Sequence, residues 1–405
     1  MKILVANLGS TSFKYRLFDM DQGKELARGG VERIGTAHSR VYATTVRGAS
    51  EQQTAVADHA AALEACLRAL TGPDVGILDS AKQLAAVGFK AVHAQGLSGV
   101  RKVDEGVLAA MEAYYAVAPA HNPPYVQAMR VLSQRFPWLP LVAAFETDFH
   151  RTIEPAYRYY AIPYEWAERY GIQRYGFHGA SHRYIAERAA QLLGRSDLRL
   201  ISCHLGGSSS LCALRHGRSV ACSLGFSPQS GLPHNNRVGD FDVFALPALM
   251  RATGQSLEQI LEILASRSGL LGLSGSSNDW RDLEAAASRG DARAQLALDV
   301  FVAAVRQYLG SYLLLLGGAD AVVFTGGIGE RSATTRERIC ADLDWFGIRL
   351  DSVRNRDIRG EGPIHEHGSR VQVWVIPTNE EWVIARQVRE LLHSEAYDPS
   401  TRATG

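Results

Sequence analysis

Three short loops combine glycine with hydroxyl, carboxamide or cationic side chains. They are residues 7–14 (NLGSTSFK), 204–209 (HLGGSS) and 324–330 (FTGGIGE). A bound phosphate needs clustered N–H and O–H donors, a cation, and a backbone without bulky Cβ atoms. None of the loops has the Walker spacing or the dinucleotide fingerprint. A tight turn explains each loop alone equally well, but three in one chain favour phosphoryl chemistry.

The elements that must position these loops alternate along the chain. Short aliphatic runs alternate with long amphipathic segments, which predicts an α/β fold. We expect strands at 3–6, 15–18, 85–92, 141–145, 200–204, 321–324 and 371–376. We expect helices at 54–70, 123–135, 182–193, 257–266, 292–316 and 381–392. The segment 156–164 is expected to cross between two domains.

One internal similarity involves two of the loops. Segments 4–19 and 201–217 both have the pattern strand, Gly/Ser turn, strand. The pattern indicates either a duplicated domain or a coincidence, because Gly and Ser are common in hairpin turns.

Composition excludes several classes of protein. The 405 residues include 43 Lys and Arg against 42 Asp and Glu, a net charge of +1 that argues against a nucleic-acid partner held by bulk charge. The five cysteines form no C-x-x-C pair, which disfavours a disulfide scaffold and a zinc site. We find no signal peptide and no run of about 18 apolar residues, so we expect a cytoplasmic protein without a membrane partner.

Six motifs together resemble the acetate kinase family, the short-chain carboxylate kinases of the actin-like superfamily. They are NLGSTSFK at 7–14, APAHNP at 118–123, RYGFHGASHRY at 174–184, CHLGG at 203–207, FTGGIGE at 324–330 and PTNEEWVIA at 377–385. The resemblance runs from residue 3 to about residue 390. It implies duplicated ribonuclease-H-like α/β domains around a nucleotide cleft. The first would comprise 1–148 with a C-terminal helix of about 382–405, and the second, 149–381, would bind nucleotide and form a homodimer.

The resemblance also implies an activity, which is reversible transfer of the γ-phosphoryl group between ATP and a small carboxylate with Mg²⁺ or Mn²⁺. Matching positions imply metal binding by Asn7 and Glu380, phosphate binding by Ser10 and Ser12, and catalytic roles for Glu146, His178 and Arg237. The acceptor side would comprise Lys90, Val92, His121, Phe177 and Pro228. The nucleotide side would comprise Lys14, His204, Leu205, Gly206, Gly207, Ser208, Asp279, Trp280, Arg281, Gly327, Ile328, Gly329, Glu330 and Arg331.

Several of these residues have simpler explanations. Glu380 opens an expected helix and is suited to be an N-terminal carboxylate there. His178 and His182 are four residues apart, as in some metal sites, but Gly179 favours a turn at His178 and argues against zinc. Asp279 and Arg281 could be solvated loop charges, and His93 could be a core histidine near the acceptor side.

The chain departs from the family at several positions, most of them on the acceptor or γ-phosphate side. Lys90 replaces an arginine, Glu146 an aspartate, and Ala120 a leucine. In the loops, Gly207 replaces an asparagine, Asn235-Asn236 replaces Gly-Thr, and Arg331 replaces an asparagine. A smaller side chain at 120 would relax discrimination against acids larger than acetate. Three alternatives therefore stand: an acetate kinase, a kinase for propionate or another small acid, and a non-catalytic nucleotide-binding switch.

Overall fold

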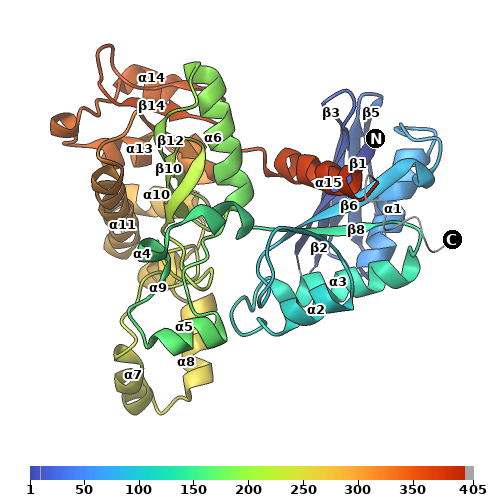
Figure 1. Ribbon diagram of the computed structural model, residues 1–405, viewed down its shortest axis with the longest axis horizontal. Helices are drawn as coiled ribbons and strands as arrows, with labels where there is room; N and C mark the ends of the chain where they lie inside the picture. The colour runs from blue at the N-terminus through green and yellow to red at the C-terminus, as the bar shows by residue number, and fades with distance from the viewer. Residues whose placement is uncertain (10, 397–405) are drawn as a thin grey trace. The chain divides into compact units, whose positions relative to one another are not determined.

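The chain forms two units in the computed structural model, which describes residues 1–9 and 11–396 (Figure 1). One unit contains Met1–Asp148 and the residues from Asn379 onward, and the other is Phe149–Thr378. Segment 156–164 lies inside the second unit, so the expected crossover there is wrong. The prolines in and next to this segment instead lie at helix starts. Pro155 begins α4 (Pro155–Arg158), and Pro163 precedes α5 (Tyr164–Tyr170).

The first unit is built on an eight-stranded sheet of order β5-β4-β3-β2-β1-β6-β8-β7. Its strands are β1 (Lys2–Gly9), β2 (Ser12–Asp19), β3 (Lys24–Glu32), β4 (Ser39–Thr45), β5 (Gly48–Thr54), β6 (Leu84–Ala91), β7 (Val100–Lys102) and β8 (Leu141–Phe145). From β1 to β5, each strand pairs antiparallel with the next strand in the chain. Strand β6 pairs parallel with both β1 and β8. The helices are α1 (His59–Thr71), α2 (Glu105–Glu112), α3 (Asn122–Arg135) and α15 (Glu380–Ala396).

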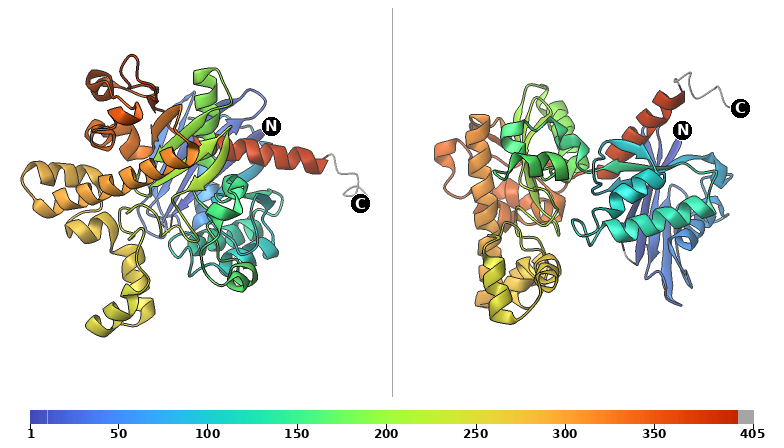
Figure 2. Two further views of the ribbon diagram at one scale, coloured as in Figure 1. Left: turned by 60° about the vertical axis from the view of Figure 1, so that its left-hand side comes forward. Right: turned by 60° about the horizontal axis from the view of Figure 1, so that its bottom comes forward.

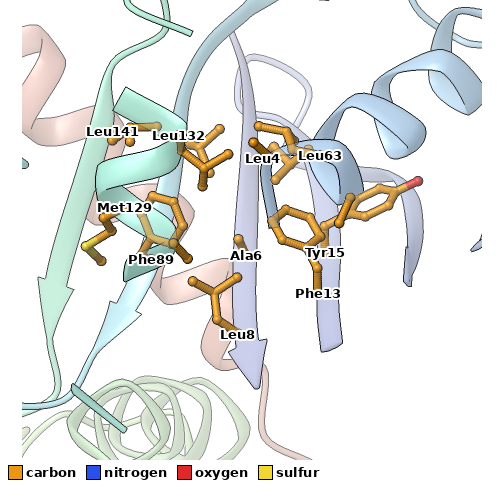
Figure 3. Close-up of a cluster of buried hydrophobic side chains, with 14 of the residues drawn as sticks. Leu4, Ala6, Leu8, Phe13, Tyr15, Leu63, Phe89, Met129, Leu132 and Leu141 are labelled. Carbon is orange, nitrogen blue, oxygen red and sulfur yellow. The ribbon is translucent and has the colours of Figure 1, made fainter. Parts of the chain in front are cut away.

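Strand β1 is buried on both faces, because helices cover both sides of the sheet. Leu4, Ala6 and Leu8 belong to the core that includes Leu63 of α1 and Met129 of α3 (Figure 3). The other face of the sheet lies against α15. A Cβ at Gly88 of β6 would lie 2.8 Å from Val388 and 3.1 Å from Ile384, so this glycine permits the close approach of α15.

The second unit contains a six-stranded sheet of order β11-β10-β9-β12-β14-β13. Its strands are β9 (Arg199–His204), β10 (Ser210–Arg215), β11 (Arg218–Cys222), β12 (Ala321–Thr325), β13 (Gly362–Pro363) and β14 (Gln372–Val375). The helices after α5 are α6 (Gly179–Leu193), α7 (Ala245–Thr253), α8 (Leu257–Ser266), α9 (Gly269–Ser274), α10 (Trp280–Ser288), α11 (Ala292–Leu316), α12 (Gly326–Arg331), α13 (Ala333–Cys340) and α14 (Ser352–Asp357).

Helices α6 and α11 cover opposite faces of this sheet (Figure 2). Among the described residues, α11 alone is long and apolar enough to cross a membrane by length and composition. Its residues Phe301, Val305 and Leu309 are instead buried in the core with Ile201 and Phe324 of the sheet. Helix α11 is therefore a core helix.

The two sheets repeat one strand arrangement. The order β3-β2-β1-β6-β8 of the first unit matches β11-β10-β9-β12-β14 of the second. In both, the first three strands form an antiparallel meander, and two later strands extend the sheet in parallel from its first strand: β6 and β8 in the first unit, β12 and β14 in the second. This shared order confirms the duplicated α/β fold, so the similarity between segments 4–19 and 201–217 is not a coincidence of turn composition.

Candidate active site

The β1–β2 hairpin carries the first phosphate-type loop. Its register places Asn7 opposite Lys14 and Gly9 opposite Ser12. Directly opposite residues point to the same face of a sheet, so the carboxamide and the ammonium share a face. Tyr125 of α3 holds the hairpin end, since its Oη donates to Asn7 Oδ1 (3.3 Å) and accepts from Leu8 N (3.2 Å). Ser10 lies outside the described residues.

A charged group lies at the ends of β6 and β8. Lys90 Nζ of β6 is 2.9 Å from Glu380 Oε2, at the first residue of α15. Glu146 directly follows β8, is 4% exposed, and donates its backbone N–H to Ala91 O (2.8 Å). Burial acts to lower the pKa of Lys90, but the Glu380 and Glu146 carboxylates outweigh it and raise that pKa, so Lys90 is an ammonium.

The oxygen donors in this unit fit Mg²⁺. Asn7 supplies a carboxamide oxygen, and Glu380 and Glu146 supply carboxylates, all hard ligands of the type that Mg²⁺ prefers. In the described part of the chain, no group of three or more His, Cys, Asp or Glu side chains is arranged to hold a metal ion. A magnesium ion here would therefore keep water or phosphate oxygens in most positions, as Mg²⁺ commonly does.

The remaining acceptor-side residues of the first unit have mixed environments. Val92 is buried and His121 is half-buried directly before α3, next to exposed Ala120. His93 is fully buried, its ring lies 4.6 Å from that of Tyr114, and its carbonyl accepts a hydrogen bond from Asn122. These contacts favour the core-histidine interpretation of His93.

In the second unit, four histidines form a chain of rings. His178 and His204 stack at 4.3 Å, and His182 lies 6.4 Å from both and 5.8 Å from His150. Serine hydroxyls fix them: Ser210 to His178 and His182, Ser202 to His182, and Ser181 to His204, all at 2.8–2.9 Å. His178 has φ 56° and ψ 32° directly before α6, which confirms the turn predicted at His178.

This arrangement is not that of a zinc pair, because both ring nitrogens of His182 are already bound to serines. Burial, with the neighbouring His150 and His204, lowers the pKa of His182 well below its ordinary value. His182 is therefore a neutral support behind the half-buried His178 and His204.

Arg237 is a buried cation without a carboxylate partner among the described residues. It is 6% exposed, and its Nη1 donates to the carbonyl of buried Pro228 at 2.6 Å. Burial lowers the pKa of Arg237 to about 10, so the guanidinium remains charged at neutral pH. An unpaired buried charge is costly, and an anionic group placed against this guanidinium would relieve that cost.

The glycine-rich turns of the second unit line a cavity of about 230 Å³. Its wall is formed by Gly206, Gly207, Asn235, Asp279, Trp280, Arg281, Glu284, Gly327, Ile328, Arg331 and Ser332. The loop after β12 closes tightly, because Gly326 has φ 77° and a Cβ there would lie 2.7 Å from Leu205 O. Leu205 O also accepts from Ile328 N (2.8 Å) and Gly329 N (3.1 Å), which fixes the two glycine turns together.

Most of the residues expected on the nucleotide side of this unit line that cavity, but some do not. The side chain of Leu205 is fully buried in the core, and His204 stacks on His178 instead. Glu330 Oε1 accepts from Gly326 N (2.9 Å) and so stabilises the turn itself. Asp279 caps α10, and its hydrogen bonds from Arg281 lower its pKa to about 2.

Asn235, Glu284 and Ser332 also line this cavity, although no role was expected for them. Ser332 lies two residues after the FTGGIGE motif, and Asn235 belongs to the segment that departs from the family next to Arg237, so their positions were the available signal. Glu284 has no such signal. It enters the wall because Ser332 Oγ donates to its carboxylate at 2.6 Å.

A duplicated α/β fold with a glycine-walled cavity, stacked histidines and a buried, unpaired arginine is the arrangement expected of a phosphotransferase. The Acetokinase family model matches residues 2–386, and the chain belongs to that family. It is 43% identical over 400 residues to the acetate kinase of Methanosarcina mazei, with 98% of each chain covered. It is 44% identical to that of Heliobacterium modesticaldum, with 97% of this chain and 100% of the relative covered.

Solved structures agree with this assignment. An acetate kinase from Porphyromonas gingivalis is 37% identical with a TM-score of 0.86, covering 96% of this chain and 99% of its own. A propionate kinase from Francisella tularensis is 33% identical with a TM-score of 0.87, covering 95% and 98%. The chain is therefore an enzyme of the acetate kinase type, a carboxylate kinase.

Proposed function

We propose that this enzyme catalyses Mg²⁺-dependent, reversible transfer of the γ-phosphoryl group of ATP to a short-chain carboxylate, giving an acyl phosphate and ADP. Acetate is the preferred acceptor in this proposal, and Mn²⁺ can replace Mg²⁺. Two acetate kinases that are more than 40% identical over nearly the full length support it. The buried and unpaired guanidinium of Arg237 is the observation that carries the proposal, because a phosphoryl group supplies the missing anion.

The chemistry requires charge neutralisation more than proton removal. The acceptor carboxylate has a pKa of roughly 4–5 and is already ionised at neutral pH. The difficulty is to bring two anions together and to stabilise the charge that spreads over the phosphoryl oxygens. Arg237 and His178 are proposed to bind those oxygens, and Lys90 to bind the acceptor carboxylate. Asn7 and Glu380 would hold Mg²⁺, which when bound neutralises phosphate charge.

Other residues are proposed to position these groups. Glu146 lies in the electrostatic field of Lys90 and would orient the acceptor or the waters of the metal ion. Val92, Phe177 and Pro228, all buried, are proposed as apolar walls of the acceptor side, so we expect a small and partly apolar acceptor. Ser10, Ser12 and Lys14 on the first hairpin are proposed to bind phosphate oxygens.

An acyl phosphate trap tests the proposal directly. ATP, Mg²⁺ and hydroxylamine are incubated with acetate, propionate, butyrate or a hydroxylated short acid, and hydroxamate and ADP are measured together. We expect ADP release only when a carboxylate is present, with acetate giving the highest kcat/KM. Loss of turnover with EDTA and recovery with excess Mg²⁺ would establish the metal requirement. ATP binding without ADP release for any acid would contradict kinase activity and support a nucleotide-binding switch.

Propionate is the second candidate acceptor, favoured by the exposed Ala120 beside His121 and by the propionate kinase among the similar structures. A leucine at that position would fill space that a longer acid can use. Higher kcat/KM for propionate than for acetate in the same assay would select this alternative.

We also propose a cytoplasmic homodimer. Large apolar side chains are exposed on α5, α7, α8 and the loop before α7. Examples are Trp166 at 55%, Phe244 at 84% and Leu261 at 47%. Exposed apolar side chains concentrated in one region are typical of a surface that a partner covers. Light scattering after size exclusion should give twice the chain mass, and Phe244→Asp with Leu261→Asp should give the monomer mass.

A further inference from the structure

A second cavity in the second unit is lined mainly by arginine. Its volume is about 420 Å³, and its wall contains Arg331, Arg336, Arg356 and Arg359 together with Glu330, Ile358, Gly360 and Pro377. The arginines come from three neighbouring segments: the end of α12, helix α13, and α14 with the residues that follow it. Four cations face one acid across this space.

None of the four guanidinium groups has a carboxylate partner among the described residues. Arg336 is 1% exposed and donates to Asn355 Oδ1 (2.7 Å), Asn355 O (2.7 Å) and Gly329 O (2.9 Å). Arg359 Nη1 donates to the carbonyls of Arg356 and Ile358. The one acid in the wall, Glu330, is engaged by Gly326 N. The positive charge of the cavity is therefore not balanced by the protein itself.

Comparison with a neighbouring arginine shows that this pattern is local. Arg354 also lies on α14, but its Nε is 3.5 Å from the Asp351 carboxylate, and it does not line the cavity. An arginine of this helix can thus form an ion pair with a carboxylate at the helix start. Arg356 and Arg359 lack such a partner on the side where the cavity lies.

Shape and charge together define a ligand class. A planar guanidinium binds phosphate or carboxylate oxygens in pairs, and several such forks around one space match several adjacent negative charges. The volume is within the range of small-molecule pockets and exceeds what one orthophosphate needs. The cavity is distinct from the 230 Å³ cavity, with which it shares only Arg331.

We propose that this arginine-lined cavity is a second anion site, which binds a compact polyanion of the phosphate type separately from the nucleotide. Arg356 and Arg359 provide the accessible forks, Arg331 closes the side next to the nucleotide cavity, and buried Arg336 contributes fixed positive charge. The claim that this anion site is separate from the nucleotide site rests on the proposed function, in which the nucleotide binds in the 230 Å³ cavity.

Calorimetry with pyrophosphate tests the proposal on the full-length protein at fixed ionic strength. ADP is titrated first, which establishes whether nucleotide binds at all, and pyrophosphate is then titrated with ADP held at saturation. We expect one pyrophosphate per chain in the wild-type protein, with orthophosphate binding at least about tenfold more weakly because it spans fewer forks. The double variant R356Q/R359Q should lose at least about tenfold in pyrophosphate affinity.

The matched control is R354Q, which removes a charge from the same helix outside the cavity and should bind pyrophosphate as the wild type does. Equal affinities in the wild type, R354Q and R356Q/R359Q would overturn the proposal. Pyrophosphate binding that disappears when ADP saturates the protein would also overturn it, since the two anions would then share one site. Melting curves and ADP affinities of both variants show whether each protein is folded.

Discussion

The ammonium of Lys90 and the carboxylate of Glu380 are 2.9 Å apart, although the two residues are 290 positions apart in the chain. The contact joins the end of a central strand to the first turn of the C-terminal helix. It gives the lysine a partner that fixes its position, and it gives Glu380 a cationic partner.

Replacement of Lys90 should separate acceptor binding from nucleotide binding. In Lys90→Met, Glu380 and Glu146 lose their shared cation, and kcat/KM for the carboxylate should fall roughly 100-fold or more. Lys90→Arg keeps the charge and should retain most of the activity. Steady-state kinetics with each substrate varied in turn should show a raised KM for the acid and a KM for ATP within about twofold of wild type. Unchanged acid kinetics in Lys90→Met would exclude the proposed role.

The two buried arginines of the second unit should respond oppositely to neutral replacement. Burial lowers the pKa of both Arg237 and Arg336 to about 10, but Arg336 donates to three protein oxygens, whereas Arg237 donates to the carbonyl of Pro228. Arg336→Met should therefore cost roughly 2–4 kcal/mol of unfolding free energy. Arg237→Met should cost little stability, because it removes an uncompensated charge, yet reduce kcat roughly 1000-fold.

Urea denaturation and hydroxamate formation measured on the same preparations check this contrast. A large loss of stability in Arg237→Met would show that this arginine is structural, and near-normal turnover would show that it does not bind the transferring group.

Acid should destabilise the protein through its buried histidines. Burial lowers the pKa of His150 to about 4, with partial opposition from its hydrogen bond to Phe177 O. The unfolded state, with an ordinary pKa near 6.5, binds the proton first, so stability is complete above about pH 6.5 and falls as the pH decreases toward 4. This histidine alone should contribute about 3 kcal/mol to that loss, and His182 acts in the same direction.

Unfolding free energies measured from pH 7.5 to 4.5 should therefore depend less on pH in His150→Gln. The control His367→Gln changes an exposed histidine and should keep the wild-type slope. Identical slopes in all three proteins would show that His150 is not the titrating group.

The size of residue 120 should set acceptor preference. Ala120→Leu introduces a larger side chain next to His121, and it should lower kcat/KM for propionate relative to acetate by roughly 10- to 100-fold, the range that one or two methylene groups provide in a pocket. Ala120→Ser, which adds little volume, is the control and should leave the ratio near that of wild type. Parallel changes for both acids in Ala120→Leu would place residue 120 outside the acceptor pocket.

The elements that could be predicted are those whose structure depends on neighbouring residues in the sequence. The first and second strands of each repeated hairpin, the core helix 292–316 and the turn at His178 all follow from nearby residues. Strands β3 to β5 were not predicted. For β5 (GASEQQT) the reason is physical, because none of its residues is buried and its sequence shows no alternation of apolar and polar residues. The helix expected from Thr54 begins at His59, since Thr54 ends β5 and Asp58 caps the helix.

Contacts between distant residues could not be predicted in this way. The motifs pointed to most of the residues that line the glycine-walled cavity, but not to Glu284, which enters the wall through Ser332. Nothing in the sequence around Lys90 indicates that its partner is Glu380, and nothing around Tyr125 indicates that its hydroxyl holds the end of β1. Such pairs depend on how strands and helices from opposite ends of the chain pack together.

The position of α15 has a consequence for the order in which the two units can complete their folding during synthesis. The ribosome releases residues 149–378, a contiguous unit, before it has synthesised the helix that covers Val5 and Gly88. During translation one apolar face of the N-terminal sheet therefore stays uncovered while more than two hundred residues are added. The core of the first unit is therefore completed only after α15 has been synthesised and has packed on the sheet.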